Sequence, residues 1–114
     1  MAKKLTYAQI IILQRYYGVT ETQDSINSGQ CWLMEGSQGR FAMNMLEAGV
    51  CMLPLVPRRD YYGNTVPPRN VIKSGATGSF ANSQNFWQKV EDGNYEVIEG
   101  LEETFGCVSQ NEVA

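Results

Sequence analysis

The strongest constraint on folding lies in the middle of the chain, in the segment from Pro54 to Ser79. This segment contains all four prolines of the 114-residue sequence, four of its nine basic residues, and Asp60 as its only acid. Proline fixes one backbone dihedral angle and lacks an amide hydrogen, so the segment cannot continue a helix or lie inside a sheet. We therefore expect long irregular chain here, and long irregular segments in compact domains are commonly functional.

Helical patterns lie on both sides of this segment. The capping-box pattern Thr6-x-x-Gln9, followed by apolar spacing, predicts a helix over residues 7–17. The same pattern at Thr20-x-x-Gln23 predicts a second helix over 21–35, with an interruption at Gly29 as an alternative. Three further helices are predicted over residues 38–48, over 80–91, and from residue 94 to Phe105, with the N-caps Ser37, Ser79 and Asn94.

The third of these helices is apolar over most of its circumference, so we expect it to be central and buried, and to end at Gly49. Residues 50–56 could continue that helix, but Gly49 and Pro54 favour extended chain, with a short edge strand as one form of it. Asp60–Val66 predicts a small hairpin with Gly63-Asn64 at its turn. The predicted fold is thus mostly α, one domain over residues 1–114 of about five short helices, with a frayed tail over 106–114 and a basic, irregular segment at 54–79.

The composition argues against several classes of function. The chain has no histidine, and its three cysteines (Cys31, Cys51 and Cys107) are far apart in the sequence. A histidine-based triad and the usual zinc sites are therefore excluded, and an odd number of cysteines is typical of reduced thiols in the cytoplasm. No apolar run is long enough for a membrane span. We expect a cytoplasmic protein without a metal or cofactor, not an enzyme. We also expect core positions for Cys31, Cys51, Met34, Met43, Met45 and Met52.

The residue types of the 54–79 segment point to recognition of an anion. Guanidinium groups bind phosphate with two hydrogen bonds, tyrosine rings stack on bases, and a glycine-rich turn before a helix can offer amide hydrogens to phosphate. The candidate ligand-binding residues are Arg58, Arg59, Tyr61, Tyr62, Arg69, Lys73, Gly75, Thr77, Gly78 and Ser79. The first hypothesis is a non-enzymatic binding protein for a nucleotide or a nucleotide-derived signal, with a pocket at a homo-oligomer interface as one arrangement.

The same residues allow other interpretations. Residues 80–114 hold seven acids against one lysine, so the arginines could pair with this acidic region instead. The glycine-rich turn could be a plain connector that ends in an N-cap at Ser79. Arginine and tyrosine also concentrate binding energy at protein interfaces, so the second hypothesis is a protein–protein interaction module or inhibitor, of the kind that phages and other mobile elements encode, which docks on an acidic protein surface.

A third, weaker alternative is DNA binding. Residues 13–20 fit the turn of a helix-turn-helix, in which Gly18-Val19-Thr20 would open the recognition helix. However, Gln14 stands where a small residue would let the two helices touch, and Asp24 stands where an apolar residue is expected. Glu21 and Asp24 would also face DNA phosphates. Nucleic acid is therefore not the expected partner.

Overall fold

The structure is a computed structural model that describes residues 4–33, 37–60 and 62–105. Its elements, in chain order, are α1 (Tyr7–Tyr16), α2 (Thr20–Ser28), α3 (Gln30–Leu33), α4 (Ser37–Ala48), β1 (Arg58–Arg59), β2 (Thr65–Val66), α5 (Phe80–Glu91) and α6 (Tyr95–Phe105). The prediction of a mostly helical fold with a small hairpin in the basic segment is confirmed. No described helix combines the length and the apolar composition that crossing a membrane would require.

The first two helices begin differently, although their sequence signals look alike. At α1 the capping box is confirmed, since Gln9 N donates to Thr6 Oγ1 and Thr6 N donates to Gln9 Oε1. The corresponding prediction at Thr20 is wrong, because α2 begins after Val19 without a side-chain cap, and the amide of Gln23 is directed into the core instead. Tertiary contacts therefore take precedence over the local cap signal at this position.

The second predicted helix is divided, so the described chain contains one helix more than expected. Gly29 adopts a left-handed conformation with a φ of +83°, which ends α2 before α3 resumes for about one turn. The remainder of the predicted helix, residues 34–35, and the predicted frayed tail over 106–114 lie outside the described residues.

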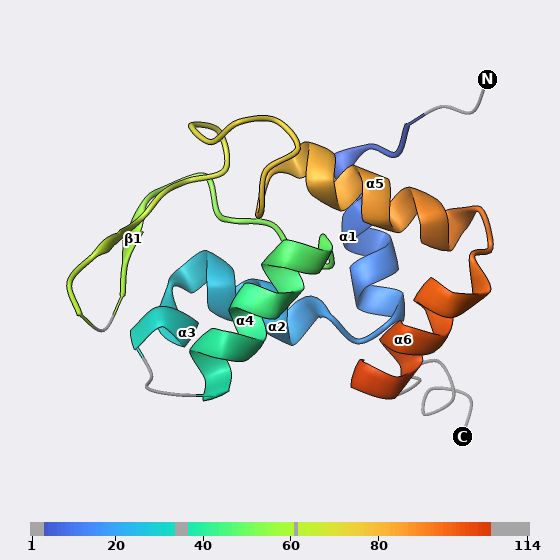
Figure 1. The fold of residues 1–114 in the computed structure, drawn as a ribbon, viewed down its shortest axis with the longest axis horizontal. Helices are drawn as coiled ribbons and strands as arrows, with labels where there is room; N and C mark the ends of the chain where they lie inside the picture. Colours follow the sequence, from blue (N-terminus) through green and yellow to red (C-terminus); the bar gives the residue numbers. More distant parts are fainter. Residues whose placement is uncertain (1–3, 34–36, 61, 106–114) are drawn as a thin grey trace.

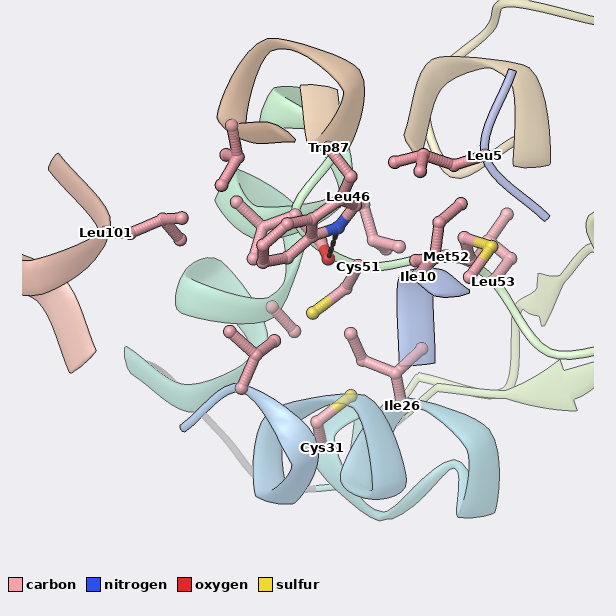
Figure 2. Close-up of a cluster of buried hydrophobic side chains, with 14 of the residues drawn as sticks. Leu5, Ile10, Ile26, Cys31, Leu46, Cys51, Met52, Leu53, Trp87 and Leu101 are labelled. Atoms are coloured by element: carbon pink, nitrogen blue, oxygen red, sulfur yellow. Dashed lines mark hydrogen bonds between the residues drawn. The ribbon is translucent and has the colours of Figure 1, made fainter. Parts of the chain in front are cut away.

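A non-helical stretch, Val50 to Leu53 followed by Pro54, runs through the centre of the molecule. Its residues are buried, with Cys51 and Met52 fully enclosed. The alternative that these residues continue the helix is wrong, because α4 ends at Ala48, and the suggested edge strand is also wrong, because the described sheet contains only β1 and β2. In Figure 2 this stretch passes among side chains of α1, α2, α4 and α5, so it forms the middle of the core.

Side chains bond the peptide groups of Val50 and Met52 in this central stretch, in place of a neighbouring strand. The Gln23 amide donates to Met52 O at 2.8 Å and accepts from Met52 N at 2.9 Å. The carbonyl oxygen of Val50 accepts from Gln14 Nε2 at 2.9 Å and from Trp87 Nε1 at 3.1 Å, the bond drawn in Figure 2. Buried peptide groups need such partners, so these side chains allow non-helical chain to lie inside a helical protein.

The end of α4 packs closely against α5. Gly49 has a φ of +95°, and a Cβ atom there would lie 2.7 Å from Asn82 O and 2.8 Å from Phe86 Cβ. Ser83 Oγ donates to Gly49 O at 2.7 Å, which fixes the contact. The expectation that α4 is central and buried holds for one face only, because Ala42 and Leu46 are buried whereas Phe41 and Met43 are exposed, and the core position predicted for Met43 is therefore wrong.

The hairpin projects from one end of the molecule, opposite α6 (Figure 1). Its register places Arg58 opposite Val66 and Arg59 opposite Thr65, so the first strand begins two residues earlier than predicted. The turn is also wider than Gly63-Asn64. The Asp60 carboxylate accepts from the amide nitrogens of Tyr62 at 3.0 Å and of Asn64 at 2.8 Å, which closes a loop between the strands.

Candidate functional site

Arg58 and Arg59 lie together at a hollow of about 450 Å³, at the base of the hairpin. Its lining comes from the end of α2, from α3 and from both strands, and comprises Ser28, Gly29, Leu33, Pro57, Arg58, Arg59 and Thr65. We refer to it as the arginine hollow. None of these lining residues is acidic, so the hollow carries two positive charges without a carboxylate in its wall.

Backbone carbonyl groups hold both guanidinium groups in place. Arg58 Nε donates to Asn27 O at 2.9 Å, at the carboxyl end of α2, where the helix dipole favours a positive charge. Arg59 NH1 donates to Gly63 O at 2.9 Å, across the hairpin loop. A guanidinium group has five N–H donors, so each arginine keeps further donors after this bond. Carbonyl bonds orient these side chains without neutralising their charge.

The tight contact between Arg58 and Gly29 explains how the arginine reaches this position. A Cβ atom on Gly29 would lie 3.0 Å from Arg58 Cδ, so the arginine stem lies directly over a residue without a side chain. Sequence reasoning missed Gly29, Ser28 and Leu33 as parts of the site. Only the tertiary contact between the α2–α3 junction and β1 brings them there, and no local pattern signals it.

Arg69, another predicted site residue, is used elsewhere. Its guanidinium carbon lies 5.0 Å from the centre of the Tyr7 ring, and its NH1 group donates to Met52 Sδ at 3.6 Å. Neither Tyr7 nor Met52 lines the arginine hollow. Arg69 therefore packs the segment against α1 and the central stretch in this structure, apart from Arg58 and Arg59.

Three backbone amides of the glycine-rich turn from Lys73 to Ser79 donate within the turn itself. Gly75 N donates to Ser79 Oγ at 3.0 Å, Ala76 N donates to Lys73 O at 3.0 Å, and Ser79 N donates to Ala76 O at 2.9 Å. Ser79 is the N-cap of α5, as predicted, because its hydroxyl accepts from Asn82 N. These bonds fit the connector interpretation of the turn.

The other predicted site residues of this region are spread apart. Lys73 is exposed, Gly78 is buried against Leu53, and Thr77 lines a different hollow. Tyr62 lies on the hairpin loop with 78% of its surface exposed, and Tyr61 lies outside the described residues. The structure thus brings Arg58 and Arg59 together and leaves Tyr62 near them on the same hairpin.

The alternative that these arginines pair with the acidic C-terminal region finds no support among the described residues. Figure 1 places α6 at the end of the molecule far from the hairpin. Arg58 and Arg59 each bond to a backbone carbonyl, and within the described ranges neither forms an ion pair with an acid of α6. The alternative that these arginines pair with the acidic region of a second copy of the chain is not addressed by the structure of a single chain.

The two described cysteines are core residues, as predicted. Burial raises the pKa of the Cys31 thiol to about 11, although a hydrogen bond with Ser25 opposes this shift. Burial, and secondarily the neighbouring Cys31, raises the pKa of Cys51 to about 12. Both thiols are therefore protonated at neutral pH and weakly nucleophilic. In the part of the chain that the structure describes, no group of three or more cysteine, aspartate or glutamate side chains could hold a metal ion.

Comparison of the chain with protein-family models, with curated proteins and with solved structures gives no match. Function is therefore inferred from the geometry of this chain.

Proposed function

We propose that this protein is a non-enzymatic binding protein that holds an anionic group, such as the phosphate of a nucleotide or of a nucleotide-derived signal, in the arginine hollow. The observation that supports this proposal is the pair Arg58 and Arg59, which share one hollow, are positioned by backbone carbonyls and have no acid in the surrounding wall. Planar guanidinium groups held in this way suit bidentate hydrogen bonds to phosphate oxygens.

Two neighbouring residues extend this site. Thr65 lies opposite Arg59 in the ladder and lines the hollow, so its hydroxyl group can donate to an oxyanion between the arginines. The exposed ring of Tyr62, on the loop of the same hairpin, can stack on a base attached to that phosphate. A phosphate with an aromatic group beside it therefore fits better than a bare inorganic anion.

The test is a binding panel of nucleoside monophosphates, diphosphates and cyclic nucleotides, followed by calorimetry on any compound that raises the melting temperature. We expect Arg58→Ala/Arg59→Ala to weaken binding by about tenfold or more, because charge-assisted hydrogen bonds are lost. Arg15→Ala/Arg40→Ala is the matched control, since it removes the same charge from exposed positions on α1 and α4. The control should keep the affinity.

The conservative variant Arg58→Lys/Arg59→Lys separates charge from geometry. It keeps the positive charge and loses the fork of donors, so we expect an intermediate affinity that falls more steeply with added salt. If no compound of the panel binds the wild type, or if the hairpin double variant binds as well as the Arg15/Arg40 control, the proposal of a nucleotide site is wrong.

Exposed apolar residues favour a second candidate function, docking on an acidic protein segment. Leu33 lines the arginine hollow and is 58% exposed, and Leu55, 59% exposed, lies three residues before Arg58. A partner with carboxylates flanked by apolar side chains would match this combination. A fluorescent peptide that alternates glutamate and leucine tests it. Leu55→Ser should weaken peptide binding and leave the nucleotide affinity unchanged. Equal peptide affinities of the wild type and Leu55→Ser would exclude this docking mode.

A further inference from the structure

A second hollow, of about 440 Å³, lies between α3, α4, the second strand of the hairpin and the chain that leads to α5. Most of its wall is apolar and comes from Trp32, Leu46, Leu53, Val66 and Ile72. Small-molecule sites in proteins have volumes of this order and similar walls, with a few polar groups that fix the orientation of the ligand. We refer to it as the tryptophan hollow.

The charges of this hollow are opposite to those of the arginine hollow. Its polar lining residues are Glu47, Asp60, Thr65 and Thr77, and the described lining contains no basic residue. The Asp60 carboxylate already accepts from two amides of the hairpin loop, and Glu47 is exposed on α4. An anion placed here would meet two carboxylates and no cation. A phosphate or carboxylate compound is therefore disfavoured, although Thr65 borders both hollows.

Trp32 supplies a hydrogen-bond donor that the protein itself does not use. The residue is 8% exposed, and its Nε1–H group is hidden from solvent without a hydrogen-bond partner among the described residues. The other indole of the chain, that of Trp87, donates to Val50 O at 3.1 Å. Buried donors are nearly always paired in native proteins, so an unpaired one requires an explanation. The Trp32 ring lines the hollow, but its Nε1–H group lies beneath the accessible surface, so the indole must turn before it can donate to an acceptor there.

We propose that the tryptophan hollow binds a small, flat, uncharged molecule, largely apolar, with a hydrogen-bond acceptor that pairs with Trp32 Nε1–H. The apolar wall selects for ring systems or short hydrocarbon groups, and the unpaired donor selects for a ring nitrogen or a carbonyl oxygen. The two carboxylates at the edge reject anions. This site does not depend on the proposed function of Arg58 and Arg59, which are absent from its wall.

Isoquinoline is a suitable probe because it is flat, mostly apolar, uncharged at neutral pH and has one acceptor nitrogen. Proton–nitrogen correlation spectra contain one indole signal for each tryptophan, and Trp32→Phe assigns them. We expect isoquinoline to shift the Trp32 signal downfield in a saturable way and to leave the Trp87 signal in place. Trp32→Phe should weaken binding by roughly threefold to tenfold, the effect of one net hydrogen bond.

Two comparisons make the test specific. Met43→Tyr places a larger side chain at the edge of the hollow, and Asn44→Tyr makes a similar change one residue along α4, outside the wall. Only the first should weaken binding, by about tenfold or more. Isoquinoline carboxylate, which adds a negative charge to the same ring, should also bind about tenfold more weakly than isoquinoline.

Three results would overturn the proposal: an unchanged Trp32 signal at the highest soluble isoquinoline concentration, equal affinities of the Met43 and Asn44 variants, or equal affinities for the neutral and the anionic ring. Arg58→Ala/Arg59→Ala should bind isoquinoline as the wild type does. Failure of the nucleotide site and failure of the tryptophan hollow are therefore distinguishable in the same set of variants.

Discussion

Replacing the two buried glutamines, Gln23 and Gln14, should lower the free energy of unfolding by very different amounts, because the two changes leave different numbers of buried peptide groups without a hydrogen-bond partner. Leucine is somewhat smaller than glutamine and has no hydrogen-bonding group. In Gln23→Leu the N–H and C=O groups of Met52 both lose the partners that they have at 2.9 Å and 2.8 Å. Met52 is fully buried, so water cannot replace them. In Gln14→Leu, by contrast, Val50 O keeps its bond from Trp87 Nε1, and Gln23 keeps both bonds to Met52.

The magnitudes follow from the number of orphaned groups. A buried donor or acceptor without a partner costs about 1–3 kcal/mol, so the two groups of Met52 predict a loss of about 2–6 kcal/mol for Gln23→Leu. Gln14→Leu orphans no described peptide group and should cost about 1–2 kcal/mol, the net value of the two ordinary hydrogen bonds that Gln14 Nε2 donates to Val50 O and Gln23 Oε1. A small domain has a total stability of about 5–15 kcal/mol, so the first change is severe and the second is mild.

Urea unfolding followed by tryptophan fluorescence and circular dichroism measures both losses, provided that the two signals coincide as two-state unfolding requires. Gln23→Leu should lower the midpoint urea concentration much more than Gln14→Leu, with little change in slope. Equal losses for the two variants, or a loss below about 1 kcal/mol for Gln23→Leu, would refute the role of the glutamine amide as the partner of the central chain.

Two further predictions concern stability. Gly49→Ala should lower the free energy of unfolding by more than about 2 kcal/mol, because the added Cβ collides with α5 and the backbone is also strained. Gly75→Ala has a similar φ of +88° but no atom within 4 Å of the added Cβ, so it should lose only about 1 kcal/mol from backbone strain. Equal losses of the two variants in thermal unfolding would contradict this prediction. Because burial raises the pKa of Cys51 from 9.0 to about 12, the stabilisation linked to its thiol is intact below pH 9.0 and is lost as the pH rises towards 12, since the unfolded chain releases its proton first. Stability measured across this range should therefore decline less steeply in Cys51→Ala, and parallel profiles would argue against the shift.

Helix boundaries could be predicted where the signal is local. Thr6 and Ser79 cap their helices as the sequence indicates, and Asn94 Oδ1 accepts from Val97 N at the start of α6. The pattern at Thr20-x-x-Gln23 has the same letters and a different outcome, because the Gln23 amide finds better partners on Met52, which is 29 positions away. A prediction from a few neighbouring residues cannot identify a hydrogen-bond partner that is so distant in the sequence.

The candidate site could also be predicted only in part. Composition alone points to the 54–79 segment, and Arg58 with Arg59 are adjacent in sequence and remain together in space. Arg69 looks equivalent by residue type, yet it is placed by a ring of α1 and a sulfur of the central stretch. Three amides of the glycine-rich turn donate to Ser79 Oγ and to carbonyl oxygens of the turn itself, which residue types cannot show.

The way in which the 54–79 segment is anchored bears on both proposed sites. Arg69 N donates to Pro54 O at 2.9 Å, and Leu53 N donates to Gly78 O at 3.0 Å. Two backbone hydrogen bonds therefore connect the segment to the buried central stretch. The hairpin between these ties is held again by Arg58 at the end of α2. A loop that is ordered before binding loses less conformational freedom when a ligand arrives. Changes that loosen the central stretch, such as Gln23→Leu, should therefore weaken ligand binding at the hairpin even though Gln23 lines neither hollow.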